Sequence, residues 1–261
     1  MRQTALRDEY EASMNQYWDV RSESYSEMNR KQLSGDRRDA WEQMIFSHVE
    51  EERPLKVLDI GTGPGFFAIL AALRGHQVTA VDMNAEMLEQ AQRNAQAAGA
   101  DIRFVQVGHT MPFEENSFDL ILSRDVTWTL TAPEEQLQDW GRLLKPGGRM
   151  LYFDAEWYYH LKNSQNRMDW ESAKADMAAA GISFYAKAGE MEEIAAGLPM
   201  TYEDRPRWDG DFWARQGYAC SIYENLNEAV YNQEEQIRYQ AHPMFLVEVR
   251  GKDASYQDIA H

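Results

Sequence analysis

The amino-acid sequence predicts an α/β fold in which a mainly parallel, doubly wound sheet carries helices on both faces. Two observations support this prediction. Short apolar stretches alternate with helix-forming stretches between residues 56 and 154, and the first apolar stretch runs through a glycine-rich turn directly into a helix. Strands that alternate with helices of about 10–15 residues form βαβ units, which place neighbouring strands parallel. The 261 residues suffice for one such domain with an added lid.

Two helices are predicted before the sheet. Residues 10–25 form the first, and Gly35 separates it from the second, at residues 39–48. The first helix carries three aromatic residues, Tyr17, Trp18 and Tyr25. We define residues 1–53, which contain both helices, as an N-terminal helical cap.

The elements of the sheet follow from apolar content and from local start and stop signals. Asn84 is placed to cap the start of one helix, and Gly99 follows its last residue. The predicted strands are residues 56–60, 77–82, 102–107, 118–123 and 149–154. The predicted helices are residues 66–73, 84–98 and 134–144. Residues 145–148, which read KPGG, are expected to close the last of these helices.

The alternation stops after residue 154. Residues 155–207 are rich in aromatic residues, Met and Ala, and they are predicted to form an inserted helical lid. Two helical stretches lie within it, at residues 169–180 and 191–196. One further helix and two strands follow, at residues 209–216, 218–223 and 244–249. We therefore expect a single domain over residues 1–261.

The composition is acidic. Asp and Glu number 43 and Lys and Arg number 26, which gives a formal net charge of −17. Such a surface repels phosphate backbones and anionic lipids, so we expect neither nucleic acid nor a membrane as partner. No apolar run approaches the roughly 20 residues of a membrane span, and we expect a cytoplasmic protein. Cys220 is the only cysteine, and no Cys or His spacing predicts a metal site.

The glycine-rich turn after the first strand predicts a nucleotide-like ligand, because glycine lets the backbone approach a ligand beyond the strand ends. Dinucleotide sites favour the spacing G-x-G-x-x-G, whereas the glycines here are Gly61, Gly63 and Gly65. Asp59, in the strand before them, is poorly placed beside a pyrophosphate but suits a ligand with an ammonium group. Asp82, at the end of the second strand, can accept both hydroxyls of a ribose, although dinucleotide sites use the same contact.

Four motifs strengthen this interpretation. The stretches VLDIGTGPGFFAI, AVDMNAEML, MPFEENSFDLILSRD and RLLKPGG resemble, in order and spacing, the motifs of class I S-adenosylmethionine-dependent methyltransferases of the type 11/25 kind. The match covers residues 56–154, and the N-terminal region and the last strand resemble the family more weakly. The resemblance implies an enzyme whose cofactor is S-adenosylmethionine. It also implies a sheet of seven strands whose last strand is antiparallel.

The resemblance further implies which residues contact the cofactor. The methionine part would be surrounded by Asp59, Gly61, Thr62, Gly63 and Gly65. The ribose and adenine would be held by Asp82, Met83, Gly108 and His109. Arg124 and Asp125 would face the methionine part and the reaction centre. The N-terminal residues that would close over the cofactor are Tyr17, Trp18 and Tyr25.

One position departs from the family pattern. Many members carry an acidic residue just after the third strand, where this chain has Val107. Adenine would then be held by backbone groups or by His109. The other interpretation of His109 is an exposed loop histidine.

The acceptor side is less clearly marked. Methyl transfer from a sulfonium is an in-line displacement, so the enzyme mainly orients the acceptor and excludes water. Trp128 and residues 154–160 follow strand ends and are the predicted acceptor wall. His160 is the predicted general base, since the pKa of an imidazole suits that task. The alternative is that these aromatic residues are the packed root of the insertion.

Three functional hypotheses follow. The first is methyl transfer from S-adenosylmethionine to a small molecule, because the acidic surface disfavours nucleic acid and the insertion could enclose a pocket. The second is a nicotinamide-dependent oxidoreductase, which the glycine spacing disfavours. The third is a non-catalytic regulator that binds S-adenosylmethionine, because no diagnostic motif marks the acceptor side.

Overall fold

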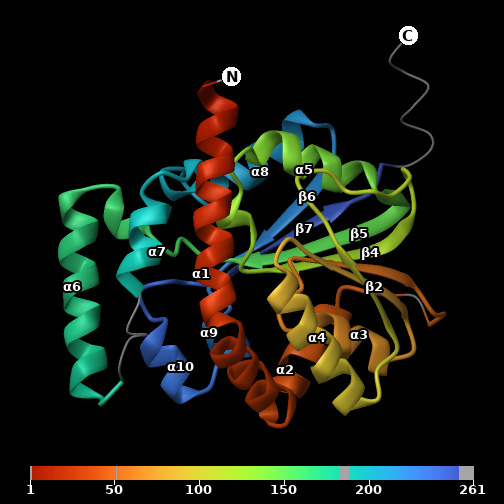
Figure 1. The fold of residues 1–261 in the computed structure, drawn as a ribbon, viewed down its shortest axis with the longest axis horizontal. Helices are drawn as coiled ribbons and strands as arrows, with labels where there is room; N and C mark the ends of the chain where they lie inside the picture. The colour runs from red at the N-terminus through yellow and green to blue at the C-terminus, as the bar shows by residue number, and fades with distance from the viewer. Residues whose placement is uncertain (1, 51, 183–187, 253–261) are drawn as a thin grey trace.

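A computed structural model describes residues 2–50, 52–182 and 188–252. Seven strands form one sheet, and helices cover both of its faces (Figure 1). The strands are β1 (Lys56–Ile60), β2 (Gln77–Asp82), β3 (Ile102–Gln106), β4 (Phe118–Arg124), β5 (Leu144–Asp154), β6 (Ala219–Tyr223) and β7 (Phe245–Arg250).

The strand order is β3-β2-β1-β4-β5-β7-β6. β1 pairs in parallel with β2 on one side and with β4 on the other, so Ile60 lies between Val81 and Ser123. β7 is antiparallel to both β5 and β6. The predicted doubly wound sheet of seven strands with an antiparallel last strand is therefore confirmed. The order of the strands runs outward from β1 in one direction through β2 and β3 and in the other through β4 and β5. Ligands of such sheets bind beyond the carboxyl ends of the strands at the point where the strand order reverses.

The structure contains helices that are longer than predicted and others that were not predicted. The helices are α1 (Arg2–Leu33), α2 (Asp36–Phe46), α3 (Phe66–Leu73), α4 (Ala85–Ala98), α5 (Pro133–Arg142), α6 (Ser164–Ala179), α7 (Ala188–Ala195), α8 (Arg207–Arg215), α9 (Asn227–Val230) and α10 (Gln233–Arg238). α1 is longer than predicted because no Gly or Pro interrupts the chain before Gly35. α9 and α10 were not predicted. No helix in the described ranges has the length and apolar character of a membrane span, and the expected cytoplasmic location stays a prediction.

β5 begins earlier than predicted. Leu144 already pairs with Phe118, and the regular register with β4 resumes where Arg149 pairs with Leu120. The KPGG stretch therefore lies inside the strand as an irregularity rather than before it. Gly148 permits this, because a Cβ there would lie 3.0 Å from the carbonyl oxygen of Asp119.

Apolar side chains on both faces of the sheet bury the core. α2, α3 and α9 cover one face, where Trp41 and Ile45 are fully buried. α5 and α8 cover the other face through Leu137 and Trp213. Burial of such side chains is the main contribution that holds the helices on the sheet.

The segment after β5 packs against the N-terminal helix. It contains two short 3-10 helices, η2 (Tyr159–Leu161) and η3 (Pro199–Thr201), besides α6 and α7. Met191 and Leu198 form a cluster with Met14 and Tyr17 of α1, and α7 lies beside α1 in Figure 1. Two segments far apart in the sequence are thereby joined at one end of the sheet.

Candidate active site

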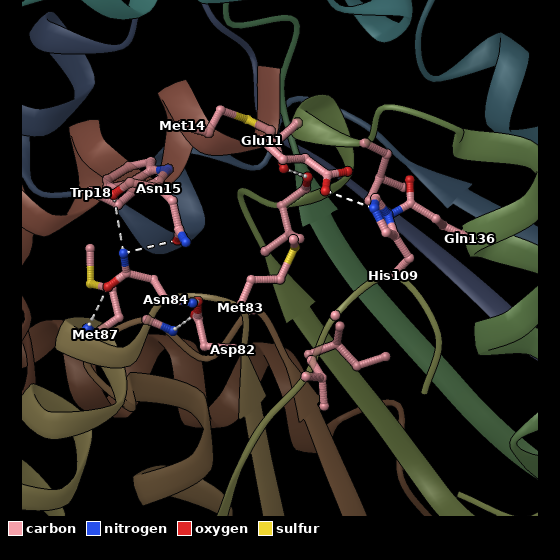
Figure 2. Close-up of a pocket in the computed structure, with 18 of the residues that line it drawn as sticks. Glu11, Met14, Asn15, Trp18, Asp82, Met83, Asn84, Met87, His109 and Gln136 are labelled. Carbon is pink, nitrogen blue, oxygen red and sulfur yellow. Dashed lines mark hydrogen bonds and ion pairs between the residues drawn. The ribbon is translucent and has the colours of Figure 1, made fainter. Parts of the chain in front are cut away.

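A first cavity lies beyond the carboxyl ends of β1, β2 and β4, and α1 closes it (Figure 2). The predicted cofactor residues that line it are Trp18, Tyr25, Gly61, Gly63, Asp82, Met83, Gly108, His109, Arg124 and Asp125. The structure therefore brings together residues from the N-terminal helix and from the ends of four strands. The predicted cofactor residues outside its lining are Tyr17, Asp59, Thr62 and Gly65.

The three glycines of the turn have different surroundings. Gly61, Gly63 and Gly65 all have positive φ, at 64°, 51° and 92°, a region that favours glycine. A Cβ on Gly61 would lie 2.3 Å from a methyl carbon of Val126, and one on Gly65 would lie 3.2 Å from the Cβ of Ala91. A Cβ on Gly63 would instead point toward the ring of Tyr25, 3.7 Å away. Gly63 is thus the glycine of the turn where an added Cβ would have space beside Tyr25.

Asp59 and Thr62 hold the turn from within. The Thr62 hydroxyl donates to Asp59 Oδ2 at 2.6 Å, and the Ala68 N–H donates to the same oxygen at 3.0 Å. Burial raises the pKa of Asp59 to about 7, against the lowering effect of these two hydrogen bonds. The predicted contacts of Asp59, Thr62 and Gly65 with the cofactor stay predictions, and the described contacts of these residues fix the shape of the turn.

Asp82 joins the turn to the cavity. Its Oδ2 accepts from the Gly63 N–H at 2.8 Å, and its Oδ1 accepts from the Asn84 N–H at 2.9 Å. Burial raises the pKa of the carboxyl, and the backbone N–H groups lower it. Each carboxylate oxygen has a second lone pair, so Asp82 can still accept hydroxyl groups from a ligand in the cavity.

Two groups of polar contacts hold α1 over the first cavity. The Asn84 side chain donates to Asn15 Oδ1 at 3.1 Å, as Figure 2 shows, and to Asp19 Oδ1 at 2.6 Å. The side-chain oxygen of Asn84 caps α4. On the other side, Glu11 Oε2 lies 2.7 Å from His109 Nε2. No local sequence pattern predicts Glu11 or Asn15 as site residues, because their partners lie about 70 to 100 residues away along the chain.

His109 is part of the cavity wall rather than a freely exposed loop residue. Glu11 holds its Nε2, and its buried Nδ1 has no hydrogen-bond partner within the described ranges. Val107 and Gly108 line the cavity next to it. The expected adenine contact of His109 stays a prediction, and the Nδ1 atom is the group that would make it.

A second cavity, of about 760 Å³, adjoins the first. Trp18, Tyr25, Arg124 and Asp125 line both, and we call these four residues the shared wall. The remaining lining combines an aromatic part with charged and polar side chains. The aromatic part comprises Tyr17, Trp128, Trp157, Tyr158, Trp170, Tyr231 and Tyr239. Its volume lies within the range of roughly 300–1,000 Å³ typical of small-ligand sites.

Arg124, one of the four residues of the shared wall, is held in place by aromatic rings and by Asp125. Its guanidinium carbon lies 4.8 to 5.2 Å from the ring centres of three aromatic residues, Trp41, Phe66 and Phe67. Its Nε is 3.7 Å from Asp125 Oδ2. Burial lowers the pKa of Arg124, whereas the nearby Tyr25 and Asp125 raise it. The charges outweigh burial, so the pKa of Arg124 is above its usual value. Arg124 therefore stays a cation.

A buried carboxylate, Asp154, organises the aromatic wall. Its Oδ2 accepts from the Thr127 hydroxyl and from the Trp128 N–H, the latter at 2.9 Å. Its Oδ1 accepts from the Trp157 indole N–H at 3.0 Å. Arg205 pairs with it at 3.1 Å and with Asp209 at 2.8 Å. This Asp154 network, which the sequence did not predict because Arg205 is 51 residues away, fixes Trp128 and Trp157 in place.

His160 lines the second cavity but not the first. Its ring is buried and stacks on Trp170 with ring centres 5.1 Å apart, and its Nε2 lies 3.3 Å from Glu192 Oε2. Burial lowers the pKa of His160, although Glu192 raises it. The predicted role of His160 as a base stays a prediction. The contacts with Trp170 and Glu192 also fit the alternative of a packed insertion.

Comparison with known proteins agrees with this geometry. Residues 58–152 match the family of the methyltransferase domain. The chain is 34% identical over 109 residues to the malonyl-[acyl-carrier protein] O-methyltransferase of Erwinia pyrifoliae, covering 41% of this chain and 40% of that protein. The chain thus spans about two fifths of that relative. A methyltransferase of Aquifex aeolicus that depends on S-adenosylmethionine shares the fold, with a TM-score of 0.54 and 17% identity over 87% of this chain and 98% of that one.

A third relative corrects one prediction. The tRNA 5-carboxymethoxyuridine methyltransferase of Escherichia coli is 35% identical over 107 residues, covering 39% of this chain and 41% of that protein. The expectation that nucleic acid is excluded as a partner is therefore wrong as an inference from net charge. The charge of −17 is a sum over the whole chain, whereas an acceptor is selected by local groups at the cavity.

Proposed function

The chain belongs to the class I S-adenosylmethionine-dependent methyltransferases, and we propose that it transfers a methyl group from S-adenosylmethionine to a small-molecule acceptor. The observation that carries this proposal is the shared wall between the two cavities. A donor in the first cavity and an acceptor in the second would meet at that wall. Holding the two reactants in line is the main contribution that a direct displacement needs.

Several features of the first cavity support S-adenosylmethionine as its ligand. When bound, the cofactor supplies an electrophilic methyl group on a sulfonium. Gly63 leaves backbone open where any side chain would point toward Tyr25. Asp82 would accept the ribose hydroxyls, and His109 Nδ1 would contact the adenine. These groups come from the ends of β2 and β3, which is where the two parts of the nucleoside would lie.

The second cavity supports a small acceptor. Its aromatic side chains can attract positive charge at the sulfonium, and an acceptor bound against them would displace water from the reacting atoms. Trp128 and Trp157 are rigid parts of the aromatic wall, because Asp154 holds both. We further propose that the described residues of the cap, 2–50, 52 and 53, cover the first cavity, and that those of the insertion, 155–182 and 188–207, form the lid of the second, within a single domain. Residues 1, 51 and 183–187 of the two predicted ranges lie outside the described residues.

Calorimetry with S-adenosylmethionine and with its demethylated product, S-adenosylhomocysteine, tests the donor. We expect both to bind. Absence of binding for both, together with tight binding of NADH, would point to the oxidoreductase alternative.

Transfer of a labelled methyl group tests the acceptor. The panel contains small thiols, amines, alcohols, phenols and carboxylic acids, and unmodified tRNA is included in parallel. We expect label in a small molecule. Label in tRNA alone would contradict the small-molecule acceptor but not methyl transfer, and cofactor binding without any transfer would favour the non-catalytic regulator.

A further inference from the structure

Asp125 occupies an unusual backbone position at the end of β4. Its φ is 59°, in the left-handed region that few residues other than glycine adopt. Its N–H donates to the Phe153 carbonyl oxygen and its own carbonyl accepts from the Trp128 indole, both at 2.9 Å. Strained conformations of this kind persist when the surrounding structure holds them, and they concentrate at functional sites. Two hydrogen bonds of the Asp125 backbone therefore hold this residue, and with it the direction of its side chain, in a conformation of the kind found at functional sites.

The carboxylate of Asp125 has one oxygen without a hydrogen bond. Oδ1 is buried, and no donor in residues 2–50, 52–182 or 188–252 is its partner. Oδ2 lies 3.7 Å from Arg124 Nε, which is an ion pair beyond hydrogen-bond distance. A buried carboxylate oxygen without a donor is costly, so a donor supplied by a ligand would be bound there.

Asp125 is part of the shared wall, so its carboxylate adjoins the place where donor and acceptor would meet. The charged and titratable groups that act on it, or on which it acts, are Arg124, Asp154, Tyr25, Tyr231 and Tyr239. Burial raises the pKa of Asp125 to about 7, Asp154 raises it too, and Arg124 lowers it. A base with a pKa near the working pH is well matched to proton transfer.

We propose that Asp125 Oδ1 accepts a proton from the acceptor, and that the methylated atom is therefore an amine nitrogen or a hydroxyl oxygen rather than a carboxylate. This inference rests on the proposed function. The acceptor atom forms a bond to the methyl carbon as the carbon–sulfur bond breaks, and sulfur keeps the electron pair of that bond. The N–H or O–H proton of the acceptor passes to Oδ1, which leaves Asp125 neutral.

The geometry favours Asp125 over two alternatives. His160 lies on the second cavity alone, and its Nε2 already faces Glu192. A carboxylate acceptor would bring a second negative charge to Oδ1, where like charges repel. An acceptor with an N–H or O–H group instead supplies the missing donor.

The first experiment needs no known acceptor. Asp125→Asn removes the base and keeps the shape, and Asn tolerates a positive φ, so the variant is expected to fold. Asp101→Asn, at an exposed position, is the matched control. We expect Asp101→Asn to bind S-adenosylhomocysteine as wild type does, and Asp125→Asn, which changes a residue that lines both cavities, to lose less than tenfold in affinity. We also expect the Asp125 carboxyl carbon, observed by NMR in the complex, to titrate near pH 7.

Two results of that experiment would overturn the proposal. A loss of more than tenfold in affinity in Asp125→Asn alone would mean that the carboxylate holds the cofactor instead of the acceptor. Titration well above neutral pH in the complex would leave the carboxyl protonated, and therefore unable to accept a proton, at the working pH. If wild type itself fails to bind S-adenosylhomocysteine, the proposed function fails, and the two failures are thereby distinguished.

The second experiment uses the labelled panel. We expect methylation of amines, alcohols or phenols at a rate that rises as pH increases through about 7. Asp125→Asn should lower kcat by about 10²–10⁴-fold and lose that pH dependence, as expected for loss of a general base. Asp101→Asn should retain both. Transfer to carboxylic acids alone, or an unchanged pH profile in Asp125→Asn, would contradict the inference.

Discussion

The glycine turn at the first cavity is built by residues close together in the sequence, whereas the aromatic wall of the second cavity depends on contacts between segments far apart in the chain. Asp59, Thr62 and Ala68 fix the glycine turn within ten residues, and Asp82 adds one contact from the next strand. The aromatic wall depends on Asp154 and on Arg205, 51 residues later. Local construction suits a site that binds one constant ligand, while distant construction lets the acceptor wall change independently.

The largest effect is expected from breaking the Asp154 network. Arg205→Ala leaves Asp154 and Asp209 buried without their cation, and removal of one partner from a buried ion pair costs about 3–5 kcal/mol of unfolding free energy. Chemical denaturation measures this loss. Arg207→Ala, which removes an exposed cation two residues away, is the control and should change stability little. Equal losses in the two variants would show that the network does not hold the wall.

Asp82→Ala addresses the opposite region. Charge-assisted hydrogen bonds to the ribose would be lost, which predicts about 1.5–3 kcal/mol weaker binding of S-adenosylhomocysteine by calorimetry. Asp101→Ala is the control, since Asp101 is exposed. Unchanged affinity in Asp82→Ala would place the ribose elsewhere and remove the main support for the first cavity as the cofactor site.

An Asn residue caps one helix at each of the two cavities, so the same substitution can be compared between them. Asn84 caps α4 at the first cavity and Asn163 caps α6 in the insertion. Replacing either by Ala should cost about 1 kcal/mol of unfolding free energy, the usual value for an N-cap. Only Asn84→Ala should also weaken binding of S-adenosylhomocysteine, because Asn84 anchors α1 through Asp19. Equal effects of both variants on that affinity would argue that α1 is not held in this way.

The free energy of unfolding should also depend on pH through Asp125. Burial raises the pKa of Asp125 from 3.8 to about 7, so between these values the folded protein keeps a proton that the unfolded chain releases. This contribution to stability is complete below about pH 4 and is lost as pH rises through 7. Asp125→Asn should therefore flatten the slope of unfolding free energy over that window. An unchanged slope would show that Asp125 titrates normally.

Features built from neighbouring residues could be predicted from the sequence, whereas contacts between distant segments could not. The strands, the glycine turn and Asp82 were predicted because their signals are local: alternation, glycine spacing and an acid at a strand end. The early start of β5 was missed because Pro146 and the following glycines normally mark a turn, and only pairing with β4 makes them part of a strand. Glu11, Asn15 and Arg205 were missed for a related reason, because their partners are brought close only by the fold.

α1 contributes Trp18 and Tyr25 to both cavities within two helical turns. A ligand in either cavity therefore presses on the same rigid element. Thermodynamic reciprocity then applies: by whatever factor the cofactor improves acceptor affinity through α1, the acceptor improves cofactor affinity by the same factor. Coupling through α1 would make the two binding events one equilibrium, so that departure of the demethylated cofactor would depend on whether methylated product is still bound.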